Sequence, residues 1–283
     1  MTDLISSPQN PRIKAVAALR ESRARRESGR ILIDGYREVE RAIDAGVVID
    51  EAYHCDSNAD ESDGAGAGAG AMGDAKAGEA DAAPRLLARL RDSGALVTRV
   101  APRVFEKIGY GDRTEGIVAI ADRPRRALGD LKFDGQPLVA IIEGLEKPGN
   151  IGAILRSADA AGVAAVIVTD PASDPYGPNA IRASTGAIFT VPLVESTRDE
   201  TREWLVARAM QIVAASPDAD RVYTDFDFAR PTAIVLGSEA RGLSEAWRVE
   251  VAGARVPMKG RADSLNVSVT AALFFFEVLR QRM

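Results

Sequence analysis

Short apolar runs alternate with segments of helical periodicity through the second half of the chain. Strands that alternate with helices predict a parallel sheet that is covered on both faces. We therefore predict an α/β domain over residues 137–283, in which a ligand would bind beyond the carboxyl ends of the strands. The predicted strands span 137–145, 164–170, 191–194, 211–216, 232–238 and 254–258. The predicted helices between them span about 150–162, 178–187, 198–210 and 242–248.

The first half of the chain shows the same alternation on a smaller scale. It predicts a small α/β domain, with a sheet of its own, over residues 1–121. Residues 122–136 are polar, contain proline and glycine and are basic at their centre, so we predict that they form a linker. The predicted strands span 31–33, 47–54, 95–100 and 116–121, and the predicted helices span 11–30, 36–45, 84–93 and 102–108.

The chain ends in a helix that is apolar on nearly every side, over residues 267–279. A helix without a polar face belongs in an interior or against a partner subunit. Ser264, Leu265 and Asn266 come directly before it. Serine and asparagine satisfy unpaired N–H groups at a helix start, so these residues can simply cap a buried helix. Alternatively, a rigid helix start holds polar groups over a pocket, and the other loops favour this second interpretation.

Composition narrows the class of protein. The single cysteine, Cys55, excludes a disulfide framework and a zinc site built from cysteines, and one histidine, His54, cannot anchor a metal cluster. No apolar run reaches transmembrane length, and the first residues lack the apolar core of a signal peptide. We therefore predict a soluble cytoplasmic protein with no metal and no membrane contact.

The net charge of −5 is unevenly distributed along the chain. Residues 56–83 form a Gly/Ala/Asp segment with a net charge of −6, which leaves +1 for the rest. This segment has too few large apolar residues to pack, so we predict a disordered surface insertion. Residues 11–30 carry a net charge of +5, which indicates either a solvated helix face or a surface that contacts the phosphate backbone of a nucleic acid.

Two loops that follow predicted strands combine glycine with polar side chains. After the first strand, Gly149 and Gly152 flank Asn150, and Arg156 follows on the next helix. After the strand at 232–238, Glu239 lies between glycines at 237 and 242. Each loop alone is explained equally well by helix capping or by a strand–turn–helix connection. The sequence contains neither a dinucleotide-binding glycine motif after the first strand nor a P-loop.

Three segments together resemble, in order, the three motifs of the SpoU (TrmH-like) RNA ribose 2′-O-methyltransferases of the SPOUT superfamily. They are NIGAILRSADAAG (150–162), IVLGSEARGLSEAW (234–247) and VPMKGRADSLNVSVTAALFFFEVLR (256–280). Residues 10–43, NPRIKAVAALRESRARRESGRILIDGYREVERAI, also resemble the substrate-binding domain of the ribosomal-RNA branch of that family. The resemblance covers nearly the whole chain except residues 56–83.

The resemblance implies a fold, a reaction and partners. The implied fold is a SPOUT catalytic domain with a deep C-terminal trefoil knot, preceded by an L30e-like domain, and we expect a homodimer through the knotted domain. The implied reaction is methyl transfer from S-adenosylmethionine to a ribose 2′-hydroxyl of ribosomal RNA, which we expect to be that of the large subunit (23S rRNA). Two alternatives remain open, a tRNA 2′-O-methyltransferase and a non-catalytic RNA-binding protein of the same fold.

The resemblance also implies roles for individual residues. Arg156 is cast as the base that takes the hydroxyl proton, although a guanidinium, with a pKa above ~12, is a poor base and suits a phosphate clamp better. The resemblance implies that the cofactor contacts lie at the ends of three strands and are largely provided by backbone groups. The implied catalytic residues are Asn150, Arg156, Glu239, Ser264 and Asn266. The implied cofactor-binding residues are Ser216, Leu236, Gly237, Val256, Met258 and Leu265.

Overall fold

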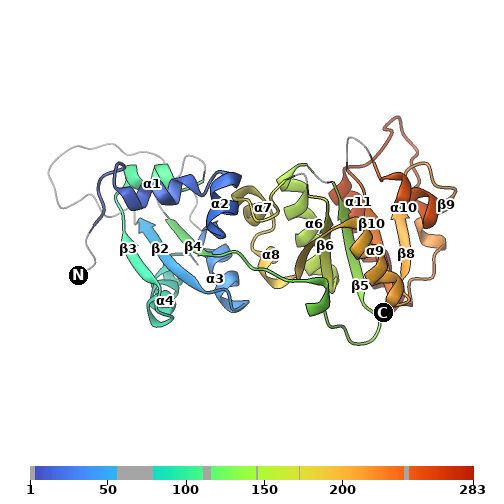
Figure 1. The fold of residues 1–283 in the computed structure, drawn as a ribbon, viewed down its shortest axis with the longest axis horizontal. Coiled ribbons are helices and arrows are strands. Elements are labelled where there is room, and N and C mark those ends of the chain that lie inside the picture. The colour runs from blue at the N-terminus through green and yellow to red at the C-terminus, as the bar shows by residue number, and fades with distance from the viewer. Residues whose placement is uncertain (1–3, 56–78, 111–115, 145, 172, 239–241) are drawn as a thin grey trace. The chain divides into compact units, whose positions relative to one another are not determined.

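The computed structural model describes residues 4–55, 79–110, 116–144, 146–171, 173–238 and 242–283. These residues form two compact units, Met1–Arg123 and Pro124–Met283 (Figure 1). Most of the predicted insertion, residues 56–78, lies outside the described residues, and its last residues form the first turn of a helix that begins at Glu79. No helix in the described part of the chain is long and apolar enough to cross a membrane.

The first unit is a four-stranded mixed sheet with helices on both faces (Figure 1). Strand β4 is antiparallel to β1 and β2, whereas β2 and β3 are parallel. Helices α1 and α5 pack together over one face, where apolar side chains of β2 and β4 join theirs in one core cluster. The elements are α1 (Pro11–Ala18), α2 (Ser22–Ser28), β1 (Arg30–Asp34), α3 (Tyr36–Asp44), β2 (Ile49–Cys55), α4 (Glu79–Asp92), β3 (Leu96–Arg99), α5 (Pro102–Ile108) and β4 (Gly116–Asp122).

The helix predicted over residues 11–30 is two helices, α1 and α2. Asn10 caps the start of α1 through a hydrogen bond from the Arg12 N–H at 2.9 Å. The break is stabilised by Arg25, which is 3% exposed and donates to the carbonyl oxygens of Leu19 at 2.7 Å and Arg20 at 2.8 Å. A buried guanidinium thus satisfies carbonyl groups that the end of α1 leaves unpaired. Arg25 is therefore a structural residue rather than part of a solvated basic face.

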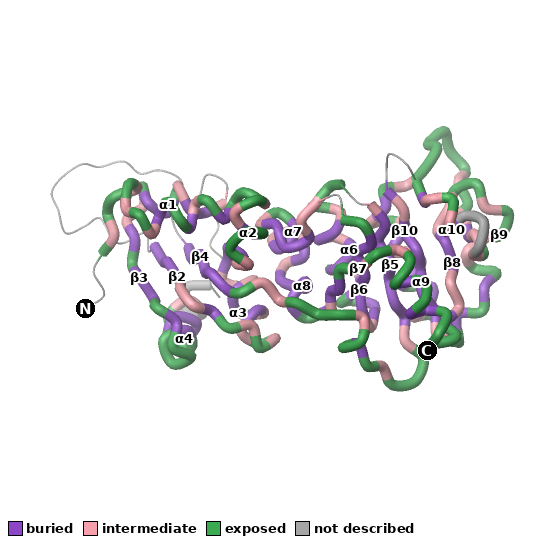
Figure 2. The backbone as a smooth tube through the Cα atoms, in the orientation of Figure 1, coloured by how far each residue is buried: buried purple, intermediate pink, exposed green. Residues whose placement is uncertain are grey.

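The second unit is a seven-stranded parallel sheet in the order β7-β6-β5-β10-β8-β11-β9. The central strands are buried along their length (Figure 2), as expected for a parallel sheet covered by helices on both faces. This confirms the predicted α/β class with a parallel sheet. The strands are β5 (Leu138–Glu143), β6 (Ala165–Thr169), β7 (Leu193–Ser196), β8 (Gln211–Ala215), β9 (Arg221–Val222), β10 (Thr232–Leu236) and β11 (Ala252–Arg255). The α-helices are α6 (Pro148–Ala161), α7 (Pro178–Ala183), α8 (Ala187–Thr190), α9 (Arg198–Ala207), α10 (Glu245–Glu250) and α11 (Val267–Arg282), with 3₁₀ turns η2 (Leu128–Asp130) and η3 (Tyr223–Asp225).

Residues 124–136, predicted as a linker, belong to this second unit. Leu131 is buried in its core cluster, and the Phe133 ring meets the Trp204 ring edge-on with centroids 5.9 Å apart. The composition of the segment concealed these apolar contacts, because its leucines and phenylalanine are scattered among proline, glycine and basic residues. Strand β9 was also missed, since two residues are too few to produce a recognisable period.

The last residues of α11 hold the 226–230 segment and the start of β5 together. The Arg282 guanidinium donates to the carbonyl oxygens of Gln136 at 2.7 Å and of Phe228 and Arg230 at 2.9 Å each. Burial lowers the pKa of Arg282 from its usual value, yet arginine stays protonated in proteins. The side chain is therefore a cationic donor shared by three carbonyl groups that lie 52 or more positions away from it in the sequence.

We expect Arg282→Ala to lower the free energy of unfolding of the second unit by about 1 to 3 kcal/mol, because carbonyl groups lose a charged donor. Urea unfolding followed by tryptophan fluorescence reports on this unit alone, since both tryptophans, Trp204 and Trp247, lie in it. The neighbouring Met283 is 97% exposed, so Met283→Ala serves as the control and should leave the midpoint unchanged. An Arg282→Ala midpoint equal to that of the control would contradict the assigned role.

Candidate active site

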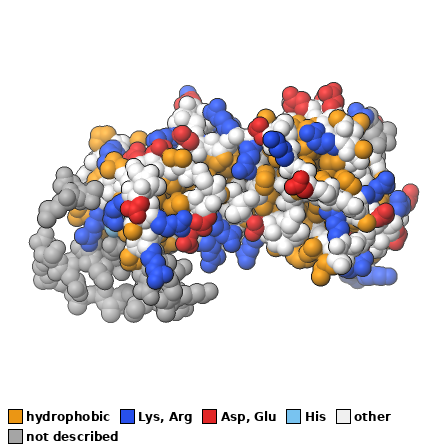
Figure 3. All heavy atoms as spheres, turned by 90° about the horizontal axis from the view of Figure 1, so that it is seen from below, with side chains coloured by type: hydrophobic (Ala, Val, Ile, Leu, Met, Phe, Trp, Pro, Cys, Tyr) orange, Lys and Arg blue, Asp and Glu red, His pale blue; other side chains and the backbone are white. Residues whose placement is uncertain are grey.

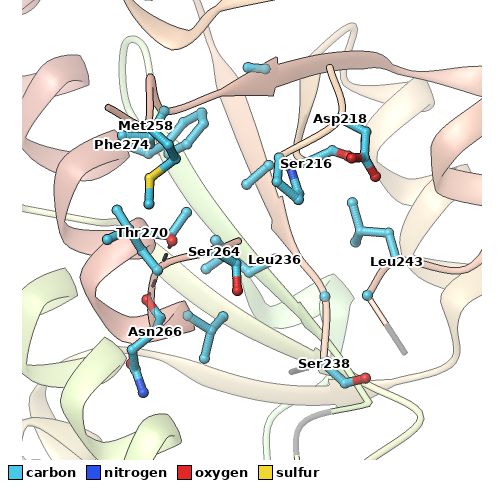
Figure 4. Close-up of a pocket in the computed structure, with 18 residues that line it drawn as sticks. Ser216, Asp218, Leu236, Ser238, Leu243, Met258, Ser264, Asn266, Thr270 and Phe274 are labelled. Carbon is cyan, nitrogen blue, oxygen red and sulfur yellow. Dashed lines mark hydrogen bonds between the residues drawn. The ribbon is translucent and has the colours of Figure 1, made fainter. Parts of the chain in front are cut away.

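The carboxyl ends of β8, β10 and β11 surround a cavity of about 420 Å³ (Figure 4). The three strands are neighbours in the sheet, so the loops that follow them meet at one edge. The start of α11 closes the same cavity. The lining residues come from the three loops, the adjoining strand ends and the first turns of α11. They are Ala215, Ser216, Pro217, Asp218, Leu236, Gly237, Ser238, Gly242, Leu243, Ala254, Val256, Met258, Ser264, Leu265, Asn266, Val267, Thr270 and Phe274.

The loop after β10 makes a close turn at the cavity wall. Ser238 and Gly242 exchange two backbone hydrogen bonds, of 3.1 Å and 2.9 Å, so the loop returns directly to the strand end. A Cβ atom at Gly237 would lie 2.4 Å from the carbonyl carbon of Gly242, a distance that real Cβ atoms do not show. The close approach of the two backbone segments therefore requires glycine at position 237. A larger residue there would clash with the Gly242 backbone and displace the loop, whether or not a ligand is bound.

A buried carboxylate fixes the far end of this loop. Glu143, at the carboxyl end of β5, accepts hydrogen bonds of 2.8 Å from both the backbone N–H and the hydroxyl of Ser244. It is 8% exposed, and both of its oxygens are used. Sequence analysis did not select Glu143, although an acid at the end of an otherwise apolar strand is a recognisable signal.

Asn266 connects the start of α11 to the start of α6. Its Oδ1 accepts hydrogen bonds from the Ser268 N–H at 2.9 Å and the Ser268 hydroxyl at 2.6 Å, so it caps α11. Its Nδ2 donates to the Asn150 Oδ1 at 3.3 Å. Asn150 lies in the first turn of α6, which begins at Pro148. The two alternatives for this helix start, a cap and a polar group over a pocket, are thus both realised in one side chain.

Most of the predicted site residues converge on the cavity. Asn150 does not line the cavity, but it accepts a hydrogen bond from Asn266, which does. Arg156 is exposed on α6 and does not line the cavity. Glu239 lies outside the described residues. Asp218, which lines the cavity, and Glu143, which holds Ser244, were not among the predicted site residues. The predicted residues that line the cavity are Ser216, Leu236, Gly237, Val256, Met258, Ser264, Leu265 and Asn266.

The chemistry of the lining is apolar with a polar rim. The inner wall includes buried side chains such as Leu236, Ala254 and Phe274. Serine, threonine and asparagine side chains add neutral hydrogen-bonding groups, and Asp218 adds one negative charge. Among the described residues no group of histidine, cysteine, aspartate or glutamate side chains could hold a metal ion. Such a cavity suits an organic molecule with an apolar ring and a few polar groups.

Two family profiles match this chain. The profile of the SpoU rRNA Methylase family matches residues 137–276, and that of the MRM3-like substrate binding domain matches residues 10–119. A 23S rRNA (uridine(2479)-2′-O)-methyltransferase from Streptomyces viridochromogenes is 34% identical over 65% of this chain and 67% of its own. The 23S rRNA (guanosine-2′-O-)-methyltransferase RlmB of Vibrio vulnificus is 32% identical over 70% of this chain and 83% of its own.

Two solved structures are similar to this protein over almost its whole length. A crystal structure of an RNA 2′-O ribose methyltransferase matches with a TM-score of 0.80 and 36% identity over 99% of both chains. The AdoMet-bound rRNA methyltransferase from Sinorhizobium meliloti matches with a TM-score of 0.84 and 25% identity over 99% of this chain and 98% of its own. The class is therefore that of methyltransferases with a parallel α/β sheet. Within that class, the chain belongs to the SpoU rRNA methylase family.

Proposed function

We propose that this protein transfers a methyl group from S-adenosylmethionine to a ribose 2′-hydroxyl of large-subunit ribosomal RNA, in the cytoplasm. The observation that carries the proposal is the cavity at the ends of β8, β10 and β11, with the Asn266–Asn150 hydrogen bond beside it. The relatives named above act on 23S rRNA, and two of the matched structures contain AdoMet.

The cavity fits the proposed cofactor in size and chemistry. Its volume of about 420 Å³ lies in the range of small-molecule sites, and its inner wall is apolar enough to accept an adenine ring. When bound, the cofactor supplies a methyl group on a positively charged sulfur. The described lining carries no cation that would oppose this charge. Leu236, Val256 and Leu265 would hold it, together with backbone groups beside Gly237.

The protein's own groups position the acceptor ribose. The Asn266 side-chain amide donates to the Asn150 side-chain oxygen, and Ser264 lines the cavity together with Asn266. In-line transfer requires close placement of the hydroxyl and the methyl group, and positioning alone supplies a large rate effect. Arg156 either clamps a phosphate of the RNA or accepts the hydroxyl proton. Its exposed place on α6 favours contact with RNA over contact with the cofactor.

Part of the basic 11–30 segment is available for RNA, and part is not. Arg12 and Arg30 form ion pairs with Glu51 at 2.9 Å and Asp50 at 2.6 Å. Burial would raise the pKa of Glu51, but hydrogen bonds from Tyr53 and Arg12 and the nearby cations lower it, so Arg12 has a charged partner. On the face seen in Figure 3, basic side chains are interspersed with acidic ones. The exposed bases of the segment are Lys14, Arg20, Arg23 and Arg26.

Charge reversal at Arg20 and Arg26 is expected to weaken RNA binding and to reduce the slope of log affinity against log salt by about 2, because fewer counterions are released. The matched control reverses Arg85 and Arg91, two exposed arginines of α4. Filter binding at several salt concentrations measures both slopes. An equal change in the two double variants would show that the effect comes from net charge alone. Arg25 is excluded from the set because its reversal would break the α1–α2 connection.

We also propose that the protein is a homodimer and that its second unit is knotted. Val269 and Phe276 lie on one side of α11 and are each 47% exposed, which is unusual for large apolar side chains on so apolar a helix. A second copy that packs on α11 would cover them. Residues on both sides of the terminal loop and of the loop after β10 line the cavity, and α11 then packs on α6 and β10. The end of the chain thus packs against elements that come much earlier in the sequence, which supports the proposed knot.

The decisive experiment is methyl transfer with purified components. The protein is incubated with S-adenosylmethionine carrying a labelled methyl group and, separately, with large-subunit ribosomal RNA and with tRNA. We expect label in ribosomal RNA, at a position that becomes resistant to alkaline cleavage. Label in tRNA alone would favour the transfer-RNA alternative. RNA binding without any transfer would instead indicate a non-catalytic protein of this fold.

A further inference from the structure

The cavity wall carries one ionisable side chain among the eighteen described residues that line it, Asp218. Asp218 is exposed, whereas the apolar residues of the inner wall, such as Leu236 and Phe274, are buried. It therefore lies at the mouth of the cavity, where its carboxylate meets both solvent and a ligand. No described residue forms an ion pair or hydrogen bond with this carboxylate. Its charge is available to an occupant of the cavity.

The backbone around Asp218 is held in place. Ser216 N–H donates to the Ala254 carbonyl oxygen at 3.0 Å, which ties the loop to β11. Ala219 N–H donates to the Ser216 carbonyl oxygen at 3.3 Å, so residues 216–219 form a turn with proline at its second position, the place where proline is favoured. Ala219 also fills the space beside Gly253, where an added Cβ would lie 3.0 Å from the Ala219 Cβ. Asp218 is thus the third residue of a fixed turn rather than the tip of a loose loop.

We propose that Asp218 binds the ammonium group at the amino-acid end of S-adenosylmethionine, an inference that rests on the proposed function. The amino-acid end is zwitterionic, and moving charged groups into an apolar interior is costly. This end therefore stays at the mouth, while the neutral adenine ring occupies the apolar inner wall. An ammonium group has three N–H donors, and a carboxylate at the mouth is the complementary acceptor.

Three groups of S-adenosylmethionine could face Asp218: the ammonium, the sulfonium and the ribose hydroxyls. The positions of the other polar groups of the cavity favour the ammonium. The sulfonium carries no N–H or O–H donor, and it must face the acceptor ribose near Asn150 and Asn266. Figure 4 shows Asn266 and Asp218 on opposite sides of the cavity, so a sulfur on the Asn266 side is remote from Asp218. The ribose hydroxyls of the cofactor are neutral donors, and they can be satisfied by the backbone groups that surround the cavity. The ammonium alone offers both a charge and donors at the mouth.

The test is isothermal titration calorimetry of Asp218→Asn with three ligands. S-adenosylmethionine has the ammonium and the sulfonium, S-adenosylhomocysteine has the ammonium alone, and 5′-methylthioadenosine has neither. We expect the first two to bind about five- to tenfold more weakly than to the parent, the size of a charge-assisted hydrogen bond at a partly exposed site. The affinity for 5′-methylthioadenosine should stay the same. Asp218→Glu, which keeps the charge, should recover part of the loss.

Asp220→Asn is the matched control, because Asp220 is an exposed acid in the same loop that does not line the cavity. It should leave all three affinities unchanged. Weaker binding of S-adenosylmethionine alone would overturn the proposal in favour of sulfonium recognition, and equal weakening of all three ligands would overturn it in favour of the ribose. Unchanged binding in Asp218→Asn would remove Asp218 from the site while leaving the proposed function intact. Failure of the parent protein to bind S-adenosylmethionine would overturn both.

Discussion

Replacing Asn266 with aspartate is expected to slow methyl transfer by about 10²-fold, a size typical of misplaced reacting groups. The substitution separates the two roles of this side chain. Aspartate can still accept the hydrogen bonds from the Ser268 N–H and hydroxyl, so the cap of α11 remains. It cannot donate to the Asn150 Oδ1, which now faces a carboxylate instead of an amide N–H. Single-turnover methylation measures the rate, and thermal unfolding should show a melting temperature close to that of the parent.

Two further variants decide whether the Asn266–Asn150 pair acts as a unit. Ser268→Ala removes one partner of the cap without touching Nδ2 of Asn266, so it should transfer methyl groups at the parent rate. Asn150→Ala should lose about as much rate as Asn266→Asp, and the double variant should lose little more, because one shared hydrogen bond can be lost only once. Strictly additive losses would show that the two residues act independently and that their contact is incidental.

The second sheet was predictable from the sequence because its strands are unambiguous. Runs such as those of β5, β6 and β10 are continuously apolar, as expected for strands that are buried on both faces. Helical segments between them leave a parallel sheet as the simple arrangement. Parallel strands place their carboxyl ends at one edge, so the sequence predicted a ligand site formed by the loops after residues 145, 216, 238 and 258. The last three of these loops contribute residues to the cavity lining, whereas the loop after residue 145 contributes none among the described residues.

What the sequence could not predict depends on contacts between residues that are far apart. In the sequence, Glu143 is indistinguishable from an ordinary polar residue at the end of a strand. Its role depends on Ser244, which lies 101 positions later and donates two hydrogen bonds to it. Arg25 could not be distinguished in the sequence from the other arginines of the 11–30 segment. Its acceptors are carbonyl groups at the end of α1, and the hydrophobic pattern did not predict that a helix ends there. Asp218 is an intermediate case. The Ser-Pro-Asp turn after a strand can be recognised in the sequence, but the place of the Asp218 side chain in the cavity wall cannot.

Arg156 provides the sharpest separation of chemistry from binding, because it is exposed on α6 and outside the cavity lining. Arg156→Ala removes both the charge and the planar fork that holds a phosphate through two hydrogen bonds. If Arg156 orients the ribose by clamping a phosphate, we expect a rate loss of about 10²-fold or more from misplacement. The affinity for S-adenosylmethionine should be unchanged, which calorimetry checks, since no cavity residue is altered. Asp159→Ala, at an exposed position on the same helix, controls for a general effect of truncating the α6 surface.

Arg156→Lys then distinguishes the phosphate clamp from the proton acceptor. Lysine keeps the positive charge and loses the fork, so a clamp predicts an intermediate rate that does not depend on pH in the alkaline range. If residue 156 takes the proton instead, lysine, with a reference pKa of about 10.4, should give a rate that climbs as the pH rises and its neutral form accumulates. Single-turnover rates against pH for the parent and both variants separate these outcomes. Parent-like rates in Arg156→Ala would contradict both roles, because a residue that neither holds the RNA nor moves the proton is a surface residue of α6.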